Sequence, residues 1–144
     1  MSPRPVHVFT ASILGGLHRL GILNQGTVNL LMKTVAPRLI TYMISKGLLP
    51  SREEKPGPGR LAETLLRDLE AGSFHVEMEG DTLRILIEEC NYCPKRVGGA
   101  SLRGTACPIP RLIVELLHYY GYRVEGPPKL TVKTHGCVTT IKLR

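Results

Sequence analysis

The four cysteines constrain this chain most, because all of them lie in its C-terminal third. They follow the pattern Cys90-x2-Cys93-x13-Cys107-x29-Cys137, and no cysteine precedes Cys90. A Cys-x2-Cys pair can present two thiolates to one metal ion from a single turn, and two distant cysteines can complete a tetrahedral set. The pattern therefore predicts a shared structural zinc site formed by these four residues. Disulfides, or separate buried thiols, are the alternatives that the spacing leaves open.

Length and composition indicate one globular domain over residues 1–144. Apolar residues make up 42% of the chain and charged residues 22%, which is typical of globular proteins. No apolar run is long enough to cross a bilayer, and His18 and Arg19 interrupt the apolar stretch near the N-terminus. These features predict a cytoplasmic protein. Asparagine and glutamine are scarce and arginine outnumbers lysine, which indicates a thermophile, where cytosolic disulfides also occur.

The formal net charge of +7 indicates which kinds of partner the protein could bind. A basic protein can bind nucleic acid or an anionic lipid surface, but here the basic residues are spread along the chain. Several of them flank the cysteines and could balance the negative charge of a metal–thiolate group: Lys95, Arg96, Arg103 and Arg111. A nucleic-acid or protein-binding adaptor that uses the basic surface is therefore one alternative function.

Helical periodicity dominates the first half of the chain. Apolar spacing predicts helices over 8–23, 27–46 and 61–70, with a Pro/Gly-rich, mobile loop over about 50–60. Pro37 lies inside the second pattern, so we expect a kink or two abutting helices there.

Two features of these helices predict close packing. Gly15 and Gly16 weaken the first helix unless another backbone approaches it closely. The second helix carries a long apolar stripe, which we expect to be buried inside the fold or against a second copy in a homodimer. That stripe includes Val28, Leu31, Val35 and Leu39.

The second half of the chain changes to a period of two. Alternation over 74–79 and 83–88, around Gly80-Asp81, predicts a β-hairpin with one buried face. A glycine-containing cysteine loop over 90–107, a helix over 108–120 and a last pair of strands over 130–143 follow. The predicted fold class is α+β: N-terminal helices packed with an antiparallel sheet made from two hairpins, with one helix between the hairpins.

Cys107 is predicted to lie at a helix N-terminus, where the macrodipole favours a thiolate. Such a thiolate would suit a metal ligand, a disulfide-exchanging thiol or a nucleophile. The segment Cys107-Pro108-Ile109-Pro110 also resembles the Cys-Pro-x-Pro signature of small sulfur-carrier proteins. A sulfur carrier or sulfurtransferase component that uses Cys107 is therefore a second alternative function.

The element order and the cysteine motifs together resemble the 4-vinyl reductase domain family, which is related in fold to a subunit of the TRAPP vesicle-tethering complex. The resembling segments are residues 87–93 (Ile-Glu-Glu-Cys-Asn-Tyr-Cys), Ala106-Cys107 opening a helix, residues 121–125 and Cys137 leading the last strand. The resemblance implies a single 4-vinyl-reductase-like domain over 1–144 that dimerises through its helices. It also implies ligand sensing more than catalysis, with the cysteines as zinc ligands.

The chain departs from that family before its last turn. The family has a cysteine on the strand before this turn, whereas residues 131–135 contain none and end in His135. The fourth metal ligand is therefore Cys137 or His135. We expect a non-enzymatic small-molecule-sensing or scaffold domain, which binds a small, largely apolar ligand and carries a cysteine-rich structural metal site.

Overall fold

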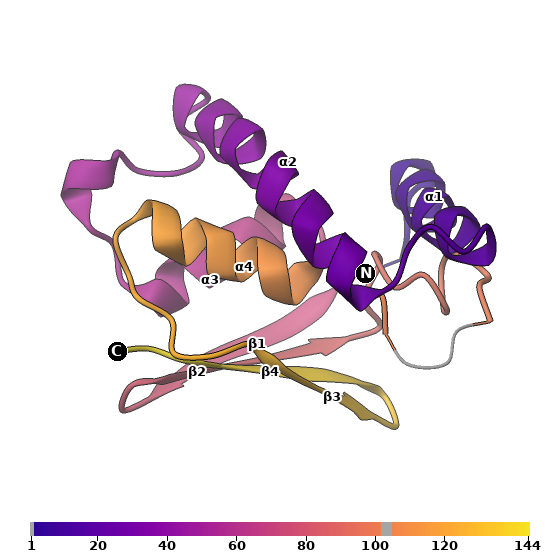
Figure 1. The fold of residues 1–144 in the computed structure, drawn as a ribbon. Helices are drawn as coiled ribbons and strands as arrows, with labels where there is room; N and C mark the ends of the chain where they lie inside the picture. Colours follow the sequence, from indigo (N-terminus) through magenta and orange to yellow (C-terminus); the bar gives the residue numbers. More distant parts are fainter. Residues whose placement is uncertain (1, 102–104) are drawn as a thin grey trace.

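A four-stranded antiparallel sheet forms the floor of the molecule, and all of the labelled helices lie on one side of it (Figure 1). The computed structural model describes residues 2–101 and 105–144. Its strands are ordered β1-β2-β4-β3. The elements are α1 Pro5–Arg19, α2 Gln25–Ser45, the short 3-10 helix η1 Arg52–Glu54, α3 Pro58–Asp68, β1 Ser73–Glu79, β2 Thr82–Glu88, α4 Ile109–Tyr119, β3 Lys129–Lys133 and β4 Gly136–Lys142. The predicted α+β class, with one helix between two hairpins, is confirmed.

Alternating side chains give the sheet one buried face. On β2, Leu83, Ile85 and Ile87 are buried, whereas Arg84 between them is exposed and forms an ion pair with Glu77 of β1. Residues opposite each other on neighbouring strands point to the same side of the sheet.

This rule also places the last cysteine. Cys137 of β4 is opposite Ile87 of β2 on one side and Val132 of β3 on the other. Cys137 therefore shares the helix-covered face with Ile87.

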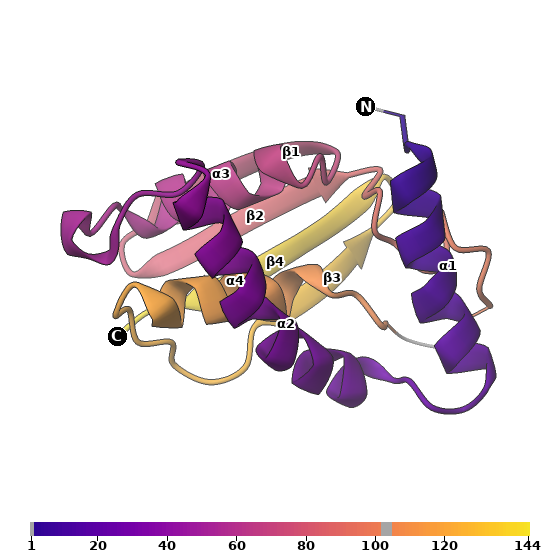
Figure 2. The same ribbon diagram turned by 90° about the horizontal axis from the view of Figure 1, so that it is seen from above.

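Three helices supply the core above the sheet, and α3 packs against β1 and α4 through Leu61, Leu65 and Leu66. The buried side of α4 lies over the sheet, and α2 crosses above α4 (Figures 1 and 2). The buried residues of α2 recur at helical spacing: Val28, Met32, Ala36, Ile40 and Met43. Of the predicted stripe, Val28 is buried and Leu39 is half-buried, whereas Leu31 and Val35 are exposed. The buried face of α2 is therefore rotated away from part of the predicted stripe.

Pro37 does not divide the second helix, contrary to the expectation of two abutting helices. The helix α2 is continuous from Gln25 to Ser45 with Pro37 inside it. Pro37 is exposed, so the carbonyl that loses its helical N–H donor faces the solvent side. Water can satisfy that carbonyl, which explains why the helix continues.

Helix α1 stands apart from the other helices and lies beside the cysteine loop (Figures 1 and 2). The contact is very close: a Cβ added to Gly15 would lie 3.0 Å from the Cβ of Ala100, and one added to Gly98 would clash with the backbone of Ala11. Buried His7 packs edge-on against Tyr92, with ring centroids 5.1 Å apart. Gly15 therefore meets the expectation of close packing, while Gly16 has open space around it.

Part of one predicted loop forms helical structure. The predicted loop at 50–60 contains η1 and the first turn of α3, which begins at Pro58. The cysteine loop over 90–107 joins β2 to α4, and its residues 102–104 lie outside the described part of the chain. Within the described ranges, no helix is both long and apolar enough to cross a membrane.

Candidate functional site

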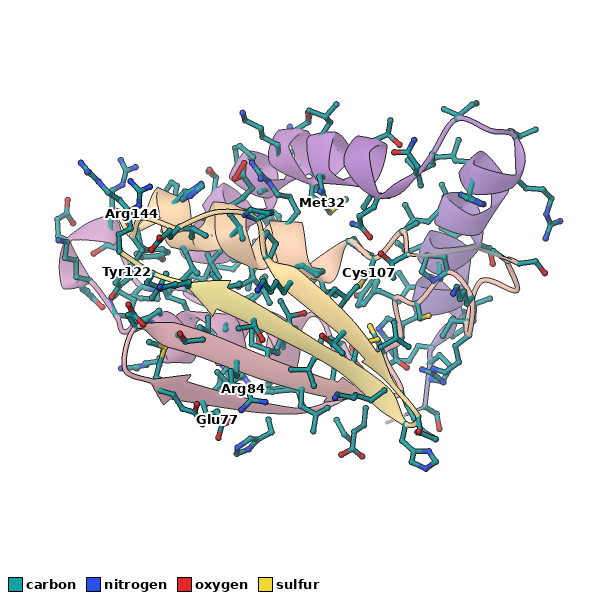
Figure 3. The ribbon with its side chains drawn as sticks, turned by 60° about the horizontal axis from the view of Figure 1, so that its bottom comes forward. Met32, Glu77, Arg84, Cys107, Tyr122 and Arg144 are labelled. Atoms are coloured by element: carbon teal, nitrogen blue, oxygen red, sulfur yellow. The ribbon has the colours of Figure 1, made fainter. Side chains whose placement is uncertain are left out.

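A pocket of about 570 Å³ opens between the cysteine loop, the start of α4 and the sheet surface. All four cysteines line it, although they come from three separate segments of the chain: Cys90, Cys93, Cys107 and Cys137. Figure 3 shows Cys107 where the chain enters α4. All four are free thiols of intermediate exposure. The pocket is therefore the place where the predicted site residues come together.

The Cys-x2-Cys turn is held from below by a buried asparagine. Asn91 is fully buried; its side-chain amide donates to the carbonyl of Glu70 at 2.8 Å, and its backbone N–H donates to the carbonyl of Ala71 at 2.8 Å. Glu89, the residue directly after β2, has a left-handed φ of 52°, which turns the chain away from the strand. Asn91 thus fixes Cys90 and Cys93 to the junction between α3 and β1.

An arginine holds the same turn from the loop side. The Arg96 guanidinium donates to the carbonyl of Cys90 at 2.8 Å and also to the carbonyl of Glu89. Its backbone N–H points at the sulfur of Cys93 at 3.5 Å. Arg96 therefore links the backbone of the turn to one of its thiols, and it places a positive charge beside the pocket.

Cys107 is positioned by Gln25, the first residue of α2. The Gln25 side-chain amide donates to the carbonyl of Cys107 at 2.9 Å, and its side-chain oxygen accepts from the N–H of Cys107 at 3.0 Å. The same oxygen also accepts from the hydroxyl of Thr105 at 2.8 Å. One side chain thus satisfies both backbone groups of Cys107 and fixes where its sulfur can lie.

Two of the thiols affect each other's pKa. The neighbouring Cys107 thiol has the largest effect on Cys90 and lowers its pKa, against the opposing effect of burial. The backbone N–H of Tyr92 and the nearby Arg96 guanidinium lower it further. Cys90 is therefore the more acidic member of the pair.

The pKa of Cys107 moves the other way. Its interaction with the Cys90 thiol raises the pKa of Cys107 well above the usual value, and burial and the negative charge of Cys90 act in the same direction. The N–H of Ile109, at the start of α4, does lower the pKa, as a helix N-terminus should, but that effect is outweighed. The predicted effect of the helix N-terminus on the Cys107 thiolate is therefore present, but the neighbouring Cys90 thiol and burial outweigh it.

Cys137 completes the group from the sheet side. Burial raises the pKa of Cys137, and the negative charges of Cys93 and Cys90 raise it further. His135 also lines the pocket, so both candidates for the fourth ligand lie at the same site. Within residues 2–101 and 105–144, however, no three His, Cys, Asp or Glu side chains converge closely enough to hold a metal ion as they stand. The thiols surround the pocket without meeting at one point.

The rest of the pocket lining combines apolar and charged residues. The apolar part includes Ile87, Ala106, Ile109, Leu130 and Val132. Lys95, Arg96 and Lys133 bring positive charge, and Glu88 and Glu89 bring negative charge. The arrangement can thus hold a thiolate-bound group and compensate its charge, and it can also cover an apolar molecule.

Sequence reasoning finds the four cysteines but misses the residues that position them. In the sequence, Asn91 stands out only as part of the motif, and Gln25 only as one of few glutamines. No local signal identifies either role, because each bonds to a backbone group 21 or 82 residues away in the chain.

Comparison with known proteins gives two relatives, both from the thermophilic archaeon Methanocaldococcus jannaschii. The uncharacterized protein MJ0207 is 33% identical over 85 residues, which cover 56% of this chain and 53% of the relative. The uncharacterized protein MJ1342 is 38% identical over 40 residues, which cover 28% of this chain and 35% of the relative. The matches thus span about half, or less, of each relative's length. No solved structure matches the chain.

The resemblance to the 4-vinyl reductase domain family was wrong. Nothing in these comparisons indicates that domain, and the family whose sequence model matches is a different one, the MJ0207 family, over residues 21–143. Helices followed by two hairpins, together with a Cys-x2-Cys turn, were too general a pattern to identify a family. The chain belongs to the MJ0207 family.

Proposed function

We propose that the protein is a non-enzymatic binding domain whose pocket holds a zinc ion through cysteine thiolates, next to a small and largely apolar ligand. One observation carries this proposal: all four cysteines of the chain, from three separate segments, line a single pocket. Thiolate sulfur is the ligand that structural zinc sites use most, and four of them make a complete tetrahedral set.

The donor chemistry of the pocket fits zinc. All four cysteines line the pocket; Cys90 and Cys107 are near enough to shift each other's pKa, and Cys93 is near enough to raise the pKa of Cys137. Binding would need the sulfurs to move inward, since no three of them converge in the described residues. Four thiolates and one Zn²⁺ would leave two negative charges, which Arg96 and the lysines that line the pocket are placed to balance.

The size and walls of the pocket support the second part of the proposal. A volume of about 570 Å³ far exceeds the space that one ion needs, and it lies in the usual range of roughly 300–1,000 Å³ for small-molecule sites. Ile87, Leu130 and Val132 offer apolar surface on the sheet side. A ligand there would contact apolar side chains and the metal site together, so its binding would depend on the metal.

Metal analysis tests this function. We expect about one zinc per chain in protein purified without chelator, measured by mass spectrometry. Cys93→Ser and Cys137→Ser should each lose most of that metal, because each removes one sulfur ligand. His75→Ser is the control, since His75 is a possible ligand on β1 that does not line the pocket. Zinc-free wild-type protein that also fails to take up added zinc would contradict the proposal.

The proximity of Cys90 and Cys107, which line one pocket and shift each other's pKa, favours the disulfide alternative. These two thiols are the pair that could form a disulfide, which the cysteine spacing leaves open. The sulfur-carrier alternative has less support, because the raised pKa of Cys107 keeps that sulfur protonated. A reducing cytoplasm would keep the thiols available for metal and suits the zinc proposal.

We also propose a homodimer that forms through α2. Leu31, Val35 and Tyr42 are exposed and follow helical spacing along one side of that helix. This stripe includes the part of the predicted apolar stripe that the fold itself does not cover. A nucleic-acid partner remains an alternative that is supported only by the charge of +7.

A further inference from the structure

Helix α1 carries an apolar stripe on the side that faces away from the protein. Four side chains at helical spacing form this α1 stripe, and they are 53%, 68%, 46% and 74% exposed: Val6, Phe9, Ile13 and Leu20. The opposite side of the helix is used, because His7, Ala11 and Leu14 are buried there. Single exposed apolar residues are common, but a complete stripe along one helix marks a contact surface.

The apolar surface continues beyond α1. Ile22, in the turn after the helix, is 59% exposed, and Leu30 of α2 is 66% exposed. Figures 1 and 2 both place α1 at the edge of the molecule, and within residues 2–101 and 105–144 no other labelled helix or strand lies outside it. Leu30 lies about 100° around α2 from Leu31, which belongs to the stripe that we assign to the homodimer. The two surfaces are therefore distinct.

The charge of this region is one-sided. All 12 acidic residues of the chain come after Arg52, whereas six cations lie within residues 1–52. Those cations are Arg4, Arg19, Lys33, Arg38, Lys46 and Arg52. One of them, Arg4, forms an ion pair with Glu70 at 3.0 Å. An apolar stripe flanked by cations, without any carboxylate of its own helices, complements an anionic and partly apolar partner.

We propose that α1 docks on an anionic lipid surface, with the α1 stripe inserted at the boundary between headgroups and acyl chains. From Val6 to Leu20 the stripe extends about 21 Å along a convex helix. The hydroxyl of Thr10 beside it already bonds within the helix, at 2.8 Å to the carbonyl of Val6. A fluid hydrocarbon layer accepts such a surface without matching its shape, and anionic headgroups attract Arg19 and Lys33.

A second copy of the chain fits this face less well. Arg4 and Arg19 lie at the two ends of the stripe. An antiparallel pair of α1 helices would bring Arg4 against Arg19, and a parallel pair would bring each arginine against its own copy. Glu70 already compensates Arg4, but neither α1 nor α2 has an acidic residue to compensate Arg19.

Vesicle flotation of the full chain tests the proposal. The probes are vesicles of phosphatidylglycerol mixed with phosphatidylcholine, and vesicles of phosphatidylcholine alone. We expect the chain to float with the anionic vesicles and to bind the neutral ones far less, with binding that weakens as salt rises. Replacing both Phe9→Ser and Ile13→Ser should lower the partition coefficient by about tenfold or more, because two inserted side chains are lost.

Two further variants separate the apolar and charge contributions. Arg19→Glu should weaken binding to the anionic vesicles by at least about fivefold, since each cation near such a surface contributes on that scale. Met78→Ser is the matched control, because Met78 is exposed on β1, away from α1, and its loss should leave binding unchanged.

Three results would overturn the proposal. The first is folded wild-type chain that binds neither vesicle, which would leave an acidic protein as the partner for this face. The second is vesicle binding that the change at Phe9 and Ile13 leaves intact. The third is a wild-type dimer that becomes monomeric on that change, which would assign the face to a second copy. The proposal is independent of the zinc site, so zinc content remains a separate result.

Discussion

Replacing Gly98 with alanine should separate α1 from the cysteine loop. A Cβ at this position would lie 2.7 Å from the carbonyl oxygen of Pro94 and 2.8 Å from the carbonyl carbon of Ala11. The Cβ would lie closer still to the carbonyl oxygen of Ala11. Ordinary contacts of a Cβ begin near 3.4 Å, so the backbones of α1 and the loop would have to move apart by about 1 Å. Overpacking of this kind costs about 1–3 kcal/mol. We expect the upper end, because both neighbours are backbone atoms that cannot rotate away.

Two glycines of α1 provide matched comparisons. A Cβ added to Gly16 would meet nothing within 4 Å, so Gly16→Ala should stabilise the helix by about 0.5–1 kcal/mol. A Cβ at Gly15 would meet the Cβ of Ala100 at 3.0 Å, so Gly15→Ala should fall between the other two. The order of stability should be Gly16→Ala, wild type, Gly15→Ala and then Gly98→Ala.

Thermal and urea unfolding of the zinc-free chain measure this order. A loss of about 3 kcal/mol should lower the Tm by about 10 °C for a chain of this size. Gly98→Ala should also weaken zinc binding, because the loop carries the ligands, whereas Gly16→Ala should not. A Gly98→Ala variant as stable as the wild type would refute the close contact between α1 and the loop, and so would a Gly16→Ala variant that is equally destabilised.

Three other changes test separate features of the molecule. Asn91→Ala should cost about 1–3 kcal/mol in urea unfolding, because the carbonyl of Glu70 loses its buried donor, and a cost near zero would remove Asn91 as the anchor of the turn. In zinc-free protein near neutral pH, iodoacetamide should label Cys90 before Cys107, since the pKa of Cys90 is lowered and that of Cys107 is raised. Labelling of Cys107 should increase only as the pH rises. Peptide mass spectrometry that finds Cys107 labelled first would reverse this assignment. Val35→Asp should halve the mass in solution measured by light scattering, whereas Thr41→Asp, on another side of α2, should leave that mass unchanged. A monomeric wild type would contradict the homodimer proposal.

Local patterns were enough to predict the element order. The alternation of Leu83, Ile85 and Ile87 with more exposed residues identified β2, because a half-buried strand imposes a period of two. The cysteine spacing also indicated that distant cysteines share one place, and the structure brings Cys137 to the same pocket as the Cys-x2-Cys turn. These features depend on neighbours in the chain or on the number of cysteines.

The features that failed or were missed depend on tertiary contacts. The pKa of Cys107 is set by the thiol of Cys90, 17 positions earlier in the chain, more than by the helix that follows it. Pro37 indicates a kink or two abutting helices, but α2 runs undivided through it, because its exposed position lets water replace the lost donor. The side of α1 that faces outward follows from the contact between Gly98 and Ala11, which no periodicity reveals.

The number of sulfur atoms around bound zinc tests the central claim most directly. X-ray absorption of the zinc-loaded full chain counts those ligands and measures their distances. We predict four sulfurs at about 2.3 Å, from Cys90, Cys93, Cys107 and Cys137. Cys137→Ser should reduce the count to three, with an oxygen or nitrogen ligand in the fourth position. Zinc surrounded by oxygen and nitrogen in the wild type would contradict the four-cysteine site.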